Sequence, residues 1–357
     1  MRRVLQVRSK FELELLDLDG VVGVSHAGND RERLILYVES PEHREAMPRV
    51  LAGVPVEVRV VGKVVALSSP LATAVLGGVV SDLIGAGIRS LERFLSPSRT
   101  SRVRPAPGGV SCGHPMITAG TLGVVTRDMM VLSNNHVIAA MNEGRPGDPV
   151  IQPGRYDGGT PEDVIARLER FVELVPYDRG YNLVDAAVAR PLEPAEAYVA
   201  RDIIGIGVVS GWTEPFIGMQ VYKSGRTTGV TGSTIIDVNA TMKVEGYTFG
   251  TAVFANQIVF DNPNMSSIAP GDSGSLLVTF SGSVPVAVGL CFAGSRVVGV
   301  ANRISYVIRE LGVDLGPYVP VSVPPAREMA LQVAGAMFPP VFTLGALTYS
   351  EVTKYGG

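Results

Sequence analysis

The sequence predicts a mainly β protein that begins with a small α/β domain. The 357 residues include 41 glycines and 25 prolines, which suits a body of short strands joined by tight turns. Hydrophobic residues make up 46% and charged residues 18%, so general disorder is excluded and two or three domains with their own cores are possible. Helical and strand patterns alternate only at the N-terminal end, and strand patterns dominate from about residue 109.

Residues 1–66 are expected to form the α/β domain. The segments that favour helices are 11–16 and 41–52, and those that favour strands are 20–24, 34–38 and 54–65. Such a domain could assist folding, support oligomer contacts or bind a partner. The sequence does not choose among these roles.

Residues 67–108 are expected to form an apolar helix followed by a basic, proline-containing linker. Apolar residues recur at helical spacing within 71–95, and Asp82 and four glycines in that stretch argue against a membrane span. We therefore expect no membrane insertion, and a helix that packs on the body or on a neighbouring subunit. The formal net charge of −3 gives no reason to expect nucleic-acid binding.

The cysteine usage favours a cytoplasmic protein. Cys112 and Cys291 are the two cysteines, too few for a disulfide-rich secreted framework, and the first residues lack the apolar core of a signal peptide. A bridge between the two is one alternative, and two buried free thiols are the other.

A candidate nucleophile lies in the segment 269–275, which reads Ala-Pro-Gly-Asp-Ser-Gly-Ser. A serine needs a base to take its proton and donors to stabilise an oxyanion. Glycine permits a turn tight enough for the N–H groups of Gly271 and Ser273 to converge on one point. Ser273 is therefore the candidate nucleophile, and these two N–H groups are the candidate oxyanion hole.

The candidate base and its orienting acid lie upstream. His136 follows a short apolar segment at 131–133, and Asp185 lies within the apolar run 182–188. Burial of a carboxylate in such a run is costly unless it accepts hydrogen bonds, and an imidazole N–H can donate one. The expected triad is His136, Asp185 and Ser273, in that chain order.

From about residue 109 to 312 the chain resembles the chymotrypsin-type serine peptidases. The segments that carry the resemblance, besides the three catalytic ones, are 118–124, 222–229 and 288–294. More narrowly, the chain is similar to intracellular bacterial and archaeal trypsin-like proteins with a small α/β domain ahead of the barrels. The resemblance implies a chymotrypsin-like double β-barrel, with His136 and Asp185 in a first barrel at 109–200 and Ser273 in a second at 201–313.

The resemblance also implies the activity, a serine endopeptidase that hydrolyses peptide or protein substrates through an acyl-enzyme without metal or cofactor. The family places its primary specificity pocket at the positions of Ser267, Phe292, Ala293 and Gly294. Ser267 stands where members that cleave after Arg or Lys carry an acid, so a small or medium apolar substrate side chain is expected. Phe292 departs from the small hydroxyl residue usual in the family. Two alternatives remain for Asp272: either it has an internal partner, or the enzyme rests in a latent state.

A rival interpretation is a non-catalytic or latent module that binds peptides or builds an assembly. The apolar helix at 71–95 and the proline-rich tail at 314–357 both favour contacts with other surfaces. We therefore expect a homo-oligomer, with the helix, the tail or both at its interfaces.

Overall fold

The computed structural model describes residues 2–27, 32–67 and 98–321. The chain divides into two compact units, Met1–Val321 and Ser322–Gly357. All that follows concerns the first unit, which holds the N-terminal region and the β body together. The helix expected at 71–95 and nearly all of the expected docking tail lie outside the described residues, and with them the basis of the oligomer prediction. The predicted domain boundaries stay predictions.

The N-terminal region is a sheet with helices packed on it. Its elements are α1 (Arg2–Leu16), β1 (Val21–Ala27), β2 (Arg33–Val38), α2 (Pro41–Ala46), β3 (Val50–Leu51) and β4 (Val54–Val60), and the strand order is β1-β2-β4-β3. The helix α1 starts well before the predicted 11–16. The helix α2 ends earlier than predicted, because Met47 precedes Pro48 and adopts an extended conformation. The strand predicted at 54–65 ends at Val60.

Both faces of this sheet are buried, which explains the apolar run in β2. Leu34, Leu36 and Val38 pack in one cluster with residues of α1. Ile35 and Tyr37 point the other way, into a cluster shared with the long strands of the β body. The period-2 alternation of a strand thus places one set of side chains under the helix and the other on the body.

The β body contains a closed barrel in its C-terminal half. Its strands are β17 (Gln220–Gly225), β18 (Gly229–Tyr247), β19 (Gly250–Asp261), β20 (Leu276–Ser281), β21 (Val284–Gly294) and β22 (Val298–Arg303). They pair in the order β19-β22-β21-β20-β17-β18, and an additional β18–β19 pairing closes the ring. The helix α7 (Ile304–Leu311) follows and ends at Gly312, whose φ of 62° is left-handed.

The preceding half of the body is built from smaller sheets. The order β11-β12-β14-β10-β9 gives a five-stranded sheet, β16-β15-β6 a three-stranded one, and β7-β8 a pair. The strands of these sheets are β6 (Ala106–Gly108), β7 (Ser111–Cys112), β8 (Gly120–Thr121), β9 (Val124–Val125), β10 (Val131–Ser133), β11 (Pro149–Ile151), β12 (Val164–Phe171), β14 (Ala187–Pro191), β15 (Val199–Ile203) and β16 (Gly207–Val208). The strand β13 (Tyr181–Asn182) instead pairs parallel with β19 of the barrel. The short helices are α5 (Asn135–Ile138) and α6 (Ala195–Tyr198), with 3₁₀ turns at Ala140–Asn142, Arg155–Asp157, Pro161–Asp163, Tyr177–Arg179 and Pro263–Met265.

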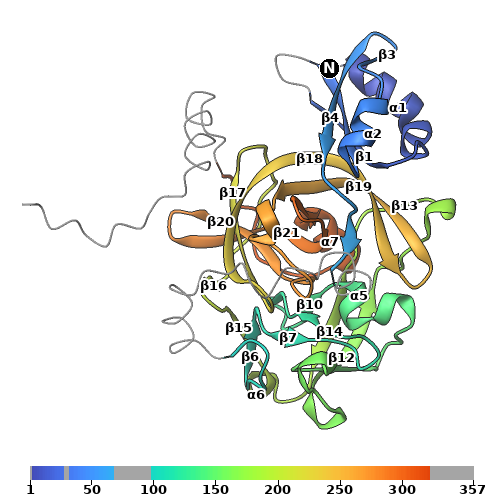
Figure 1. Ribbon diagram of the computed structural model, residues 1–357. Helices are drawn as coiled ribbons and strands as arrows, with labels where there is room; N and C mark the ends of the chain where they lie inside the picture. The colour runs from blue at the N-terminus through green and yellow to red at the C-terminus, as the bar shows by residue number, and fades with distance from the viewer. Residues whose placement is uncertain (1, 28–31, 68–97, 322–357) are drawn as a thin grey trace, which may run out of the picture. The chain divides into compact units, whose positions relative to one another are not determined.

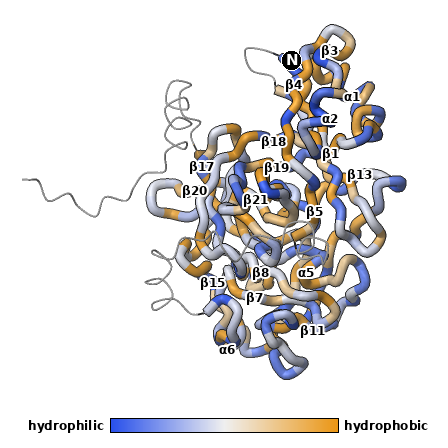
Figure 2. Tube along the Cα trace, viewed as in Figure 1, coloured by the Kyte–Doolittle hydropathy of each residue, from blue (hydrophilic) through white to orange (hydrophobic). Residues whose placement is uncertain are grey.

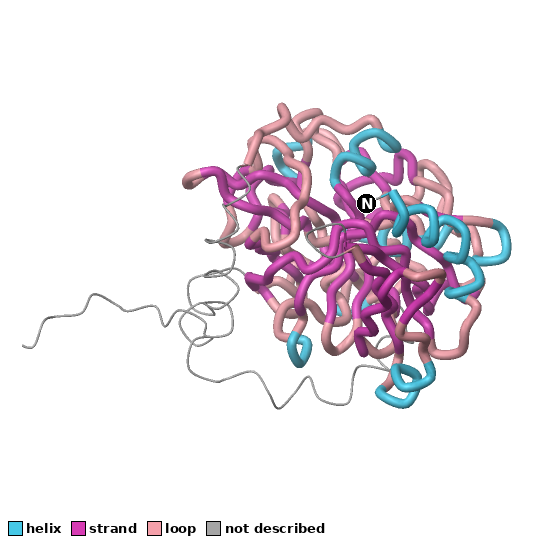
Figure 3. Tube along the Cα trace, turned by 90° about the horizontal axis from the view of Figure 1, so that it is seen from above, coloured by secondary structure: helices cyan, strands magenta, loops and turns pink. Residues whose placement is uncertain are grey.

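Strands therefore dominate the described part of the chain, and helices lie mostly at its margins (Figures 1 and 3). The predicted mainly β class is confirmed. No helix among the described residues is long and apolar enough to cross a membrane.

The strand β18 joins the N-terminal sheet to the barrel (Figure 1). It pairs antiparallel with β1, where Gly23 faces Met242. A Cβ on Gly23 would lie 3.0 Å from the Thr241 carbonyl oxygen and 2.4 Å from the Met242 sulfur, so a glycine permits the close approach. The twelve-stranded sheet that results runs from the barrel into the N-terminal region.

A buried carboxylate strengthens this junction. Asp237 on β18 is 2% exposed and accepts hydrogen bonds from Ser25 Oγ at 2.9 Å and Tyr37 Oη at 2.6 Å. Burial and the nearby Asp237 raise the pKa of Tyr37 well above its ordinary value, so its hydroxyl remains a donor. The N-terminal region thus supplies the donors that a carboxylate of the barrel requires.

The two cysteines are free and buried in different clusters. Burial raises the pKa of each thiol to about 12, so neither is a reactive thiolate near neutral pH. Of the two alternatives in the sequence, the structure shows the free thiols.

We predict that Tyr37→Phe lowers the free energy of unfolding by about 1–3 kcal/mol, because Asp237 stays buried with one donor fewer. Denaturant titration of the full chain measures the loss. Tyr177→Phe is the matched control, since Tyr177 also donates to a carboxylate, that of Asp17, but in an exposed pair. The control should change stability by less than about 0.5 kcal/mol. Equal effects for both variants would contradict the role given to Asp237.

Candidate active site

His136 and Asp185 form a buried pair in the body. His136 lies on the four-residue helix α5, directly after β10, and both side chains are fully buried. His136 Nδ1 donates to Asp185 Oδ2 at 2.5 Å, and the backbone N–H of His136 donates to Asp185 Oδ1 at 3.1 Å. The carboxylate therefore fixes both the ring and the backbone of His136, which leaves Nε2 as the nitrogen available for proton transfer.

Asp185 lies in the loop between β13 and β14, not inside a strand as its apolar neighbours predicted. In this loop, side chains supply the backbone hydrogen bonds that a neighbouring strand would otherwise make. Asn134 Nδ2 donates to the Asp185 carbonyl at 2.6 Å, and the Asp185 N–H donates to Asn302 Oδ1 at 3.0 Å. These two asparagines come from the two halves of the body, so the carboxylate is positioned from both sides.

Tyr247 is a functional candidate that the sequence did not indicate. Its hydroxyl donates to Asp185 Oδ2 at 2.8 Å, and its ring packs edge-on against His136 with centroids 6.1 Å apart. Burial, followed by the charge of Asp185, raises the pKa of Tyr247 well above its ordinary value, which keeps the hydroxyl a donor. No sequence motif indicates this residue, because Tyr247 ends the long strand β18 and reaches Asp185 only through the fold.

The Ser273 turn needs its glycines. Gly271 has a φ of 96° and Gly274 a φ of 93°, both left-handed. A Cβ on Gly274 would lie 2.2 Å from Ser133 Oγ and 2.3 Å from the Thr121 carbonyl oxygen. A larger residue at Gly274 would force the turn away from β8 and β10, and one at Gly271 would meet Thr227 Oγ1 at 2.5 Å.

Thr121 braces the same turn from the first half of the body. Its N–H donates to the Ser273 carbonyl at 2.7 Å, and its Oγ1 donates to the Gly271 carbonyl at 2.8 Å. With these carbonyls held on one side, the N–H groups of the turn are directed to the other. The sequence placed Thr121 only in a first-barrel strand and gave no sign of this contact.

The segments of Ser273 and His136 meet at Gly120. A Cβ on Gly120 would lie 2.5 Å from a methyl of Val137, the residue after His136, and 3.0 Å from the Ser273 carbonyl oxygen. Ser273 Oγ makes no hydrogen bond to the imidazole in the described part of the chain. It donates to the Phe292 carbonyl at 3.1 Å, and His136 Nε2 has no partner among the described residues.

The two expected oxyanion donors differ in their partners. The Gly271 N–H donates to the carbonyl of Leu67 at 2.8 Å. The Ser273 N–H has no acceptor within the described ranges. One of the two donors is thus engaged by a carbonyl that comes from a distant part of the same chain.

Asp272 has internal partners among the described residues. Its carboxylate accepts from the N–H of Thr227 at 2.8 Å, from that of Thr228 at 3.1 Å and from Thr228 Oγ1 at 2.6 Å. The buried ammonium of Lys223 lies 3.4 Å from Asp272 Oδ2. Burial lowers the pKa of Lys223 and the neighbouring Asp272 opposes that shift.

The predicted pocket residues are buried near this turn but face different ways. Phe292 packs on Phe254 with ring centroids 4.6 Å apart, in the cluster that also contains Tyr247. Ala293 and Gly294 pair with the short strand β5 (Val65–Ala66). Ser267 is 4% exposed and its N–H donates to Asn262 Oδ1 at 2.9 Å.

The remaining histidines have structural contacts. His114 Nε2 lies 3.3 Å from Asp148 Oδ2, His26 Nδ1 lies 2.7 Å from an Arg8 nitrogen, and His43 Nδ1 lies 3.0 Å from Ser40 Oγ. The part of the chain that the structure describes has no group of three or more His, Cys, Asp or Glu side chains arranged to hold a metal ion.

Comparison with known proteins gives fold-level likenesses alone. No protein-family model and no curated protein matches the chain. Similar solved structures include a glutamic-acid-specific serine protease, 19% identical with a TM-score of 0.40 over 58% of this chain and 98% of that chain. They also include the chymotrypsin of Cellulomonas bogoriensis, 17% identical with a TM-score of 0.39 over 58% of this chain and 97% of that chain.

A third is a Nocardiopsis protease, 20% identical with a TM-score of 0.39 over 59% of this chain and 98% of that chain. The chain resembles the chymotrypsin-like serine proteases, the class that its sequence also indicates.

We predict that Lys223→Met lowers the free energy of unfolding by about 3–5 kcal/mol, because it leaves the buried Asp272 carboxylate without its cation. Denaturant titration measures this loss, and adding Asp272→Asn should recover part of it. Lys63→Met is the control, since Lys63 pairs with Glu245 at 3.5 Å on the surface and should cost at most about 1 kcal/mol. A Lys223→Met variant as stable as the control would contradict the role of this pair.

Proposed function

We propose that the protein is a serine endopeptidase that hydrolyses peptide bonds with Ser273 as nucleophile, His136 as base and Asp185 as orienting acid. The observation that carries the proposal is the buried His136–Asp185 pair, whose free Nε2 belongs to a segment in contact with the Ser273 turn at Gly120. A buried imidazole with one nitrogen fixed by a carboxylate and the other unpartnered is suited to proton transfer.

In this mechanism Ser273 Oγ leaves the Phe292 carbonyl and attacks a substrate carbonyl while His136 Nε2 takes its proton. The N–H groups of Gly271 and Ser273 stabilise the oxyanion, each by about 3–4 kcal/mol. His136 then protonates the departing amine, and water hydrolyses the acyl-enzyme with His136 again as base. Asp185 orients the imidazole and stabilises its protonated form, and Tyr247 holds Asp185.

The substrate side chain is proposed to enter near Ser267, with Ala293 and Gly294 supplying the backbone edge that binds a peptide. Phe292 contributes its carbonyl to that edge, while its side chain packs toward Tyr247. Ser267 carries no charge to attract Arg or Lys, so the proposed preference is for an apolar side chain.

A latent or non-catalytic module is the second candidate, and two observations favour it. Ser273 Oγ donates its hydrogen bond to the Phe292 carbonyl instead of His136, and the Gly271 N–H already donates to the Leu67 carbonyl. Labelling with a fluorophosphonate separates the two candidates, because this reaction requires the nucleophile, the oxyanion hole and access together. Labelling of the wild type that is absent in Ser273→Ala supports the peptidase.

We predict that Ser273→Ala and His136→Ala each abolish peptide hydrolysis, whereas Asp185→Asn retains activity lowered by about 10⁴-fold in kcat. The difference arises because the aspartate orients the imidazole but transfers no proton. Assays of kcat on a fluorogenic peptide with an apolar residue before the cleaved bond measure these losses. Full activity in His136→Ala would refute the mechanism.

We predict that Tyr247→Phe lowers kcat by roughly 10-fold with KM unchanged, because Asp185 loses a donor and holds the imidazole less firmly. Tyr37→Phe, which also removes a hydroxyl bonded to a buried carboxylate but outside the site, is the control and should leave kcat unchanged. A change confined to KM in Tyr247→Phe would contradict a positioning role.

A further inference from the structure

A segment of the chain lies between β21 and β18, beside the Ser273 turn, and pairs with β21 as an extended peptide would; the space that it fills is called the cleft below. After the N-terminal sheet, residues 64–67 run beside β21, where Ala66 pairs with Ala293 and Val65 with Gly294, antiparallel. On its other edge β5 pairs with β18, and the Glu245 N–H donates to the Val64 carbonyl at 3.0 Å. Figure 2 shows this β5 stretch as hydrophobic among the strands of the barrel.

Leu67 ends this segment at the candidate catalytic groups. Its N–H donates to the Phe292 carbonyl at 3.2 Å, the same oxygen that accepts the Ser273 hydroxyl. Its own carbonyl accepts from the Gly271 N–H at 2.8 Å. The Leu67 carbonyl thus engages one of the two candidate oxyanion donors, and the Leu67 N–H shares its acceptor with the hydroxyl of the candidate nucleophile.

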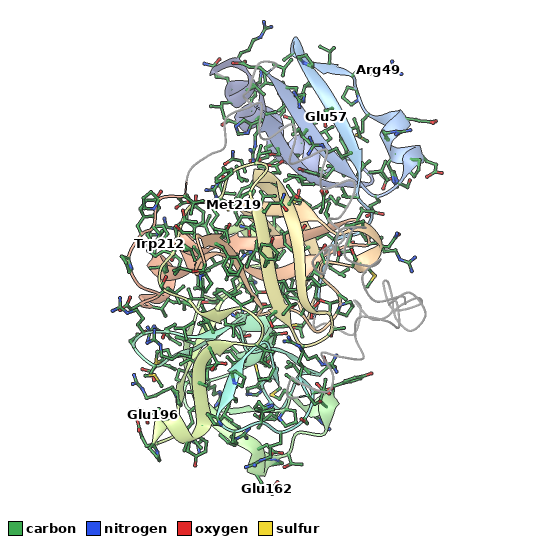
Figure 4. The ribbon with its side chains drawn as sticks, turned by 90° about the vertical axis from the view of Figure 1, so that its left-hand side faces the viewer. Arg49, Glu57, Glu162, Glu196, Trp212 and Met219 are labelled. Carbon is green, nitrogen blue, oxygen red and sulfur yellow. The ribbon has the colours of Figure 1, made fainter. Side chains whose placement is uncertain are left out.

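The side chains of the segment alternate between two pockets, as those of an extended peptide do. Leu67 is 1% exposed and packs with Val65 in a cluster that includes Met219, Phe260 and Ile268; Figure 4 labels Met219 in the barrel. Val64 and Ala66 point the other way, into the cluster of Phe292 and Tyr247. The side chains that surround Leu67 are thus apolar, and they include Ile268, the residue after Ser267.

We propose that residues 64–67 are the enzyme's own first substrate, and that Ser273 cleaves the peptide bond on the carboxyl side of Leu67 in the same chain. The proposal rests on the proposed function and specifies it: the primary pocket takes a leucine-sized apolar side chain. While residues 64–67 fill the substrate site, other substrates cannot bind there.

The reaction balances with water as the co-reactant. Ser273 Oγ bonds to the Leu67 carbonyl carbon while its proton passes to His136 Nε2. The C–N bond then breaks, and the amine of the following residue leaves with that proton. Water adds to the acyl group and releases a Leu67 carboxylate, and the overall change is hydrolysis of one peptide bond.

A purely structural role explains the segment less fully. A strand that only secures the N-terminal region to the barrel needs ladder hydrogen bonds, and β1 already makes such a junction with β18. It does not need a carbonyl placed against the left-handed Gly271 of the Gly-Asp-Ser-Gly turn. The contact with Gly271 is the one that substrate binding requires.

The test is intact-mass spectrometry of the full chain during incubation, with Ser273→Ala alongside. We expect fragments 1–67 and 68–357 from the wild type, at a first-order rate that does not change with protein concentration, and an intact Ser273→Ala chain. Ser273→Ala mixed with wild type should also remain intact, because the segment is cleaved by its own chain.

Two substitutions at Leu67 test the pocket. Leu67→Met should be cleaved, whereas Leu67→Asp should slow cleavage at this bond by roughly 100-fold or more, because its carboxylate would lose its hydration in an apolar pocket. Leu67→Asp should also react with a fluorophosphonate about 10-fold faster than the uncleaved wild type, because the cleft is open in a larger fraction of molecules. Thermal unfolding checks that both variants fold.

The outcomes separate this inference from the proposed function. If Ser273 is labelled in Leu67→Asp but the wild type is never cut after Leu67, the peptidase stands and the self-cleavage is wrong. Cleavage of Leu67→Asp at the wild-type rate would likewise overturn it. If no folded variant is labelled or cut, the proposed function fails and this inference fails with it.

Discussion

The burial of Asp185 is the constraint on which the arrangement of the site depends. A carboxylate with no solvent contact is tolerated only when donors surround it. Here His136 supplies two donors and Tyr247 a third, while Asn134 and Asn302 fix the backbone around the acid. Because these groups come from both halves of the body, the carboxylate is satisfied only when the two halves are assembled.

The long strand β18 connects three parts of the structure. It closes the barrel with β19, continues into the N-terminal sheet through β1, and brings Tyr247 to Asp185 at its far end. It also borders β5 opposite β21. The N-terminal region and the site are therefore coupled through one strand, and the occupant of the cleft follows directly from the last strand of that region.

Sequence reasoning reached the features that depend on local pattern. The mainly β class, the strands near 20–24 and 34–38, and the candidates His136, Asp185 and Ser273 were all indicated by spacing and residue type. The helix predicted at 41–52 was wrong at its end, because it ran past Pro48, which stops α2 at Ala46. Tyr247, Thr121 and Lys223 were missed, because each acts through a contact across the fold that no neighbouring residue reveals.

The strand predicted at 54–65 shows the same limit. Valines recur throughout 54–65, yet the chain leaves the N-terminal sheet after Val60 and pairs again only at Val65. Gly62, with a φ of 77°, permits the change of direction. Alternation alone cannot say which sheet a strand joins, because it indicates which residues share a face but not the neighbouring strand.

In the proposed mechanism, the Phe292 carbonyl links binding of residues 64–67 to the position of the Ser273 hydroxyl. It accepts from both Leu67 N–H and Ser273 Oγ, and a carbonyl oxygen has two lone pairs for such donors. When Ser273 rotates toward His136, the Leu67 bond remains and the segment stays in register with the oxyanion donors. With a peptide backbone in place, the Phe292 carbonyl keeps one hydrogen-bond donor when it loses the Ser273 hydroxyl. The free-energy cost of turning Ser273 toward His136 is then lower. In the structure, Ser273 Oγ donates to the Phe292 carbonyl although residues 64–67 are in place, so in the proposed mechanism the rotation toward His136 is a step that follows binding of the segment.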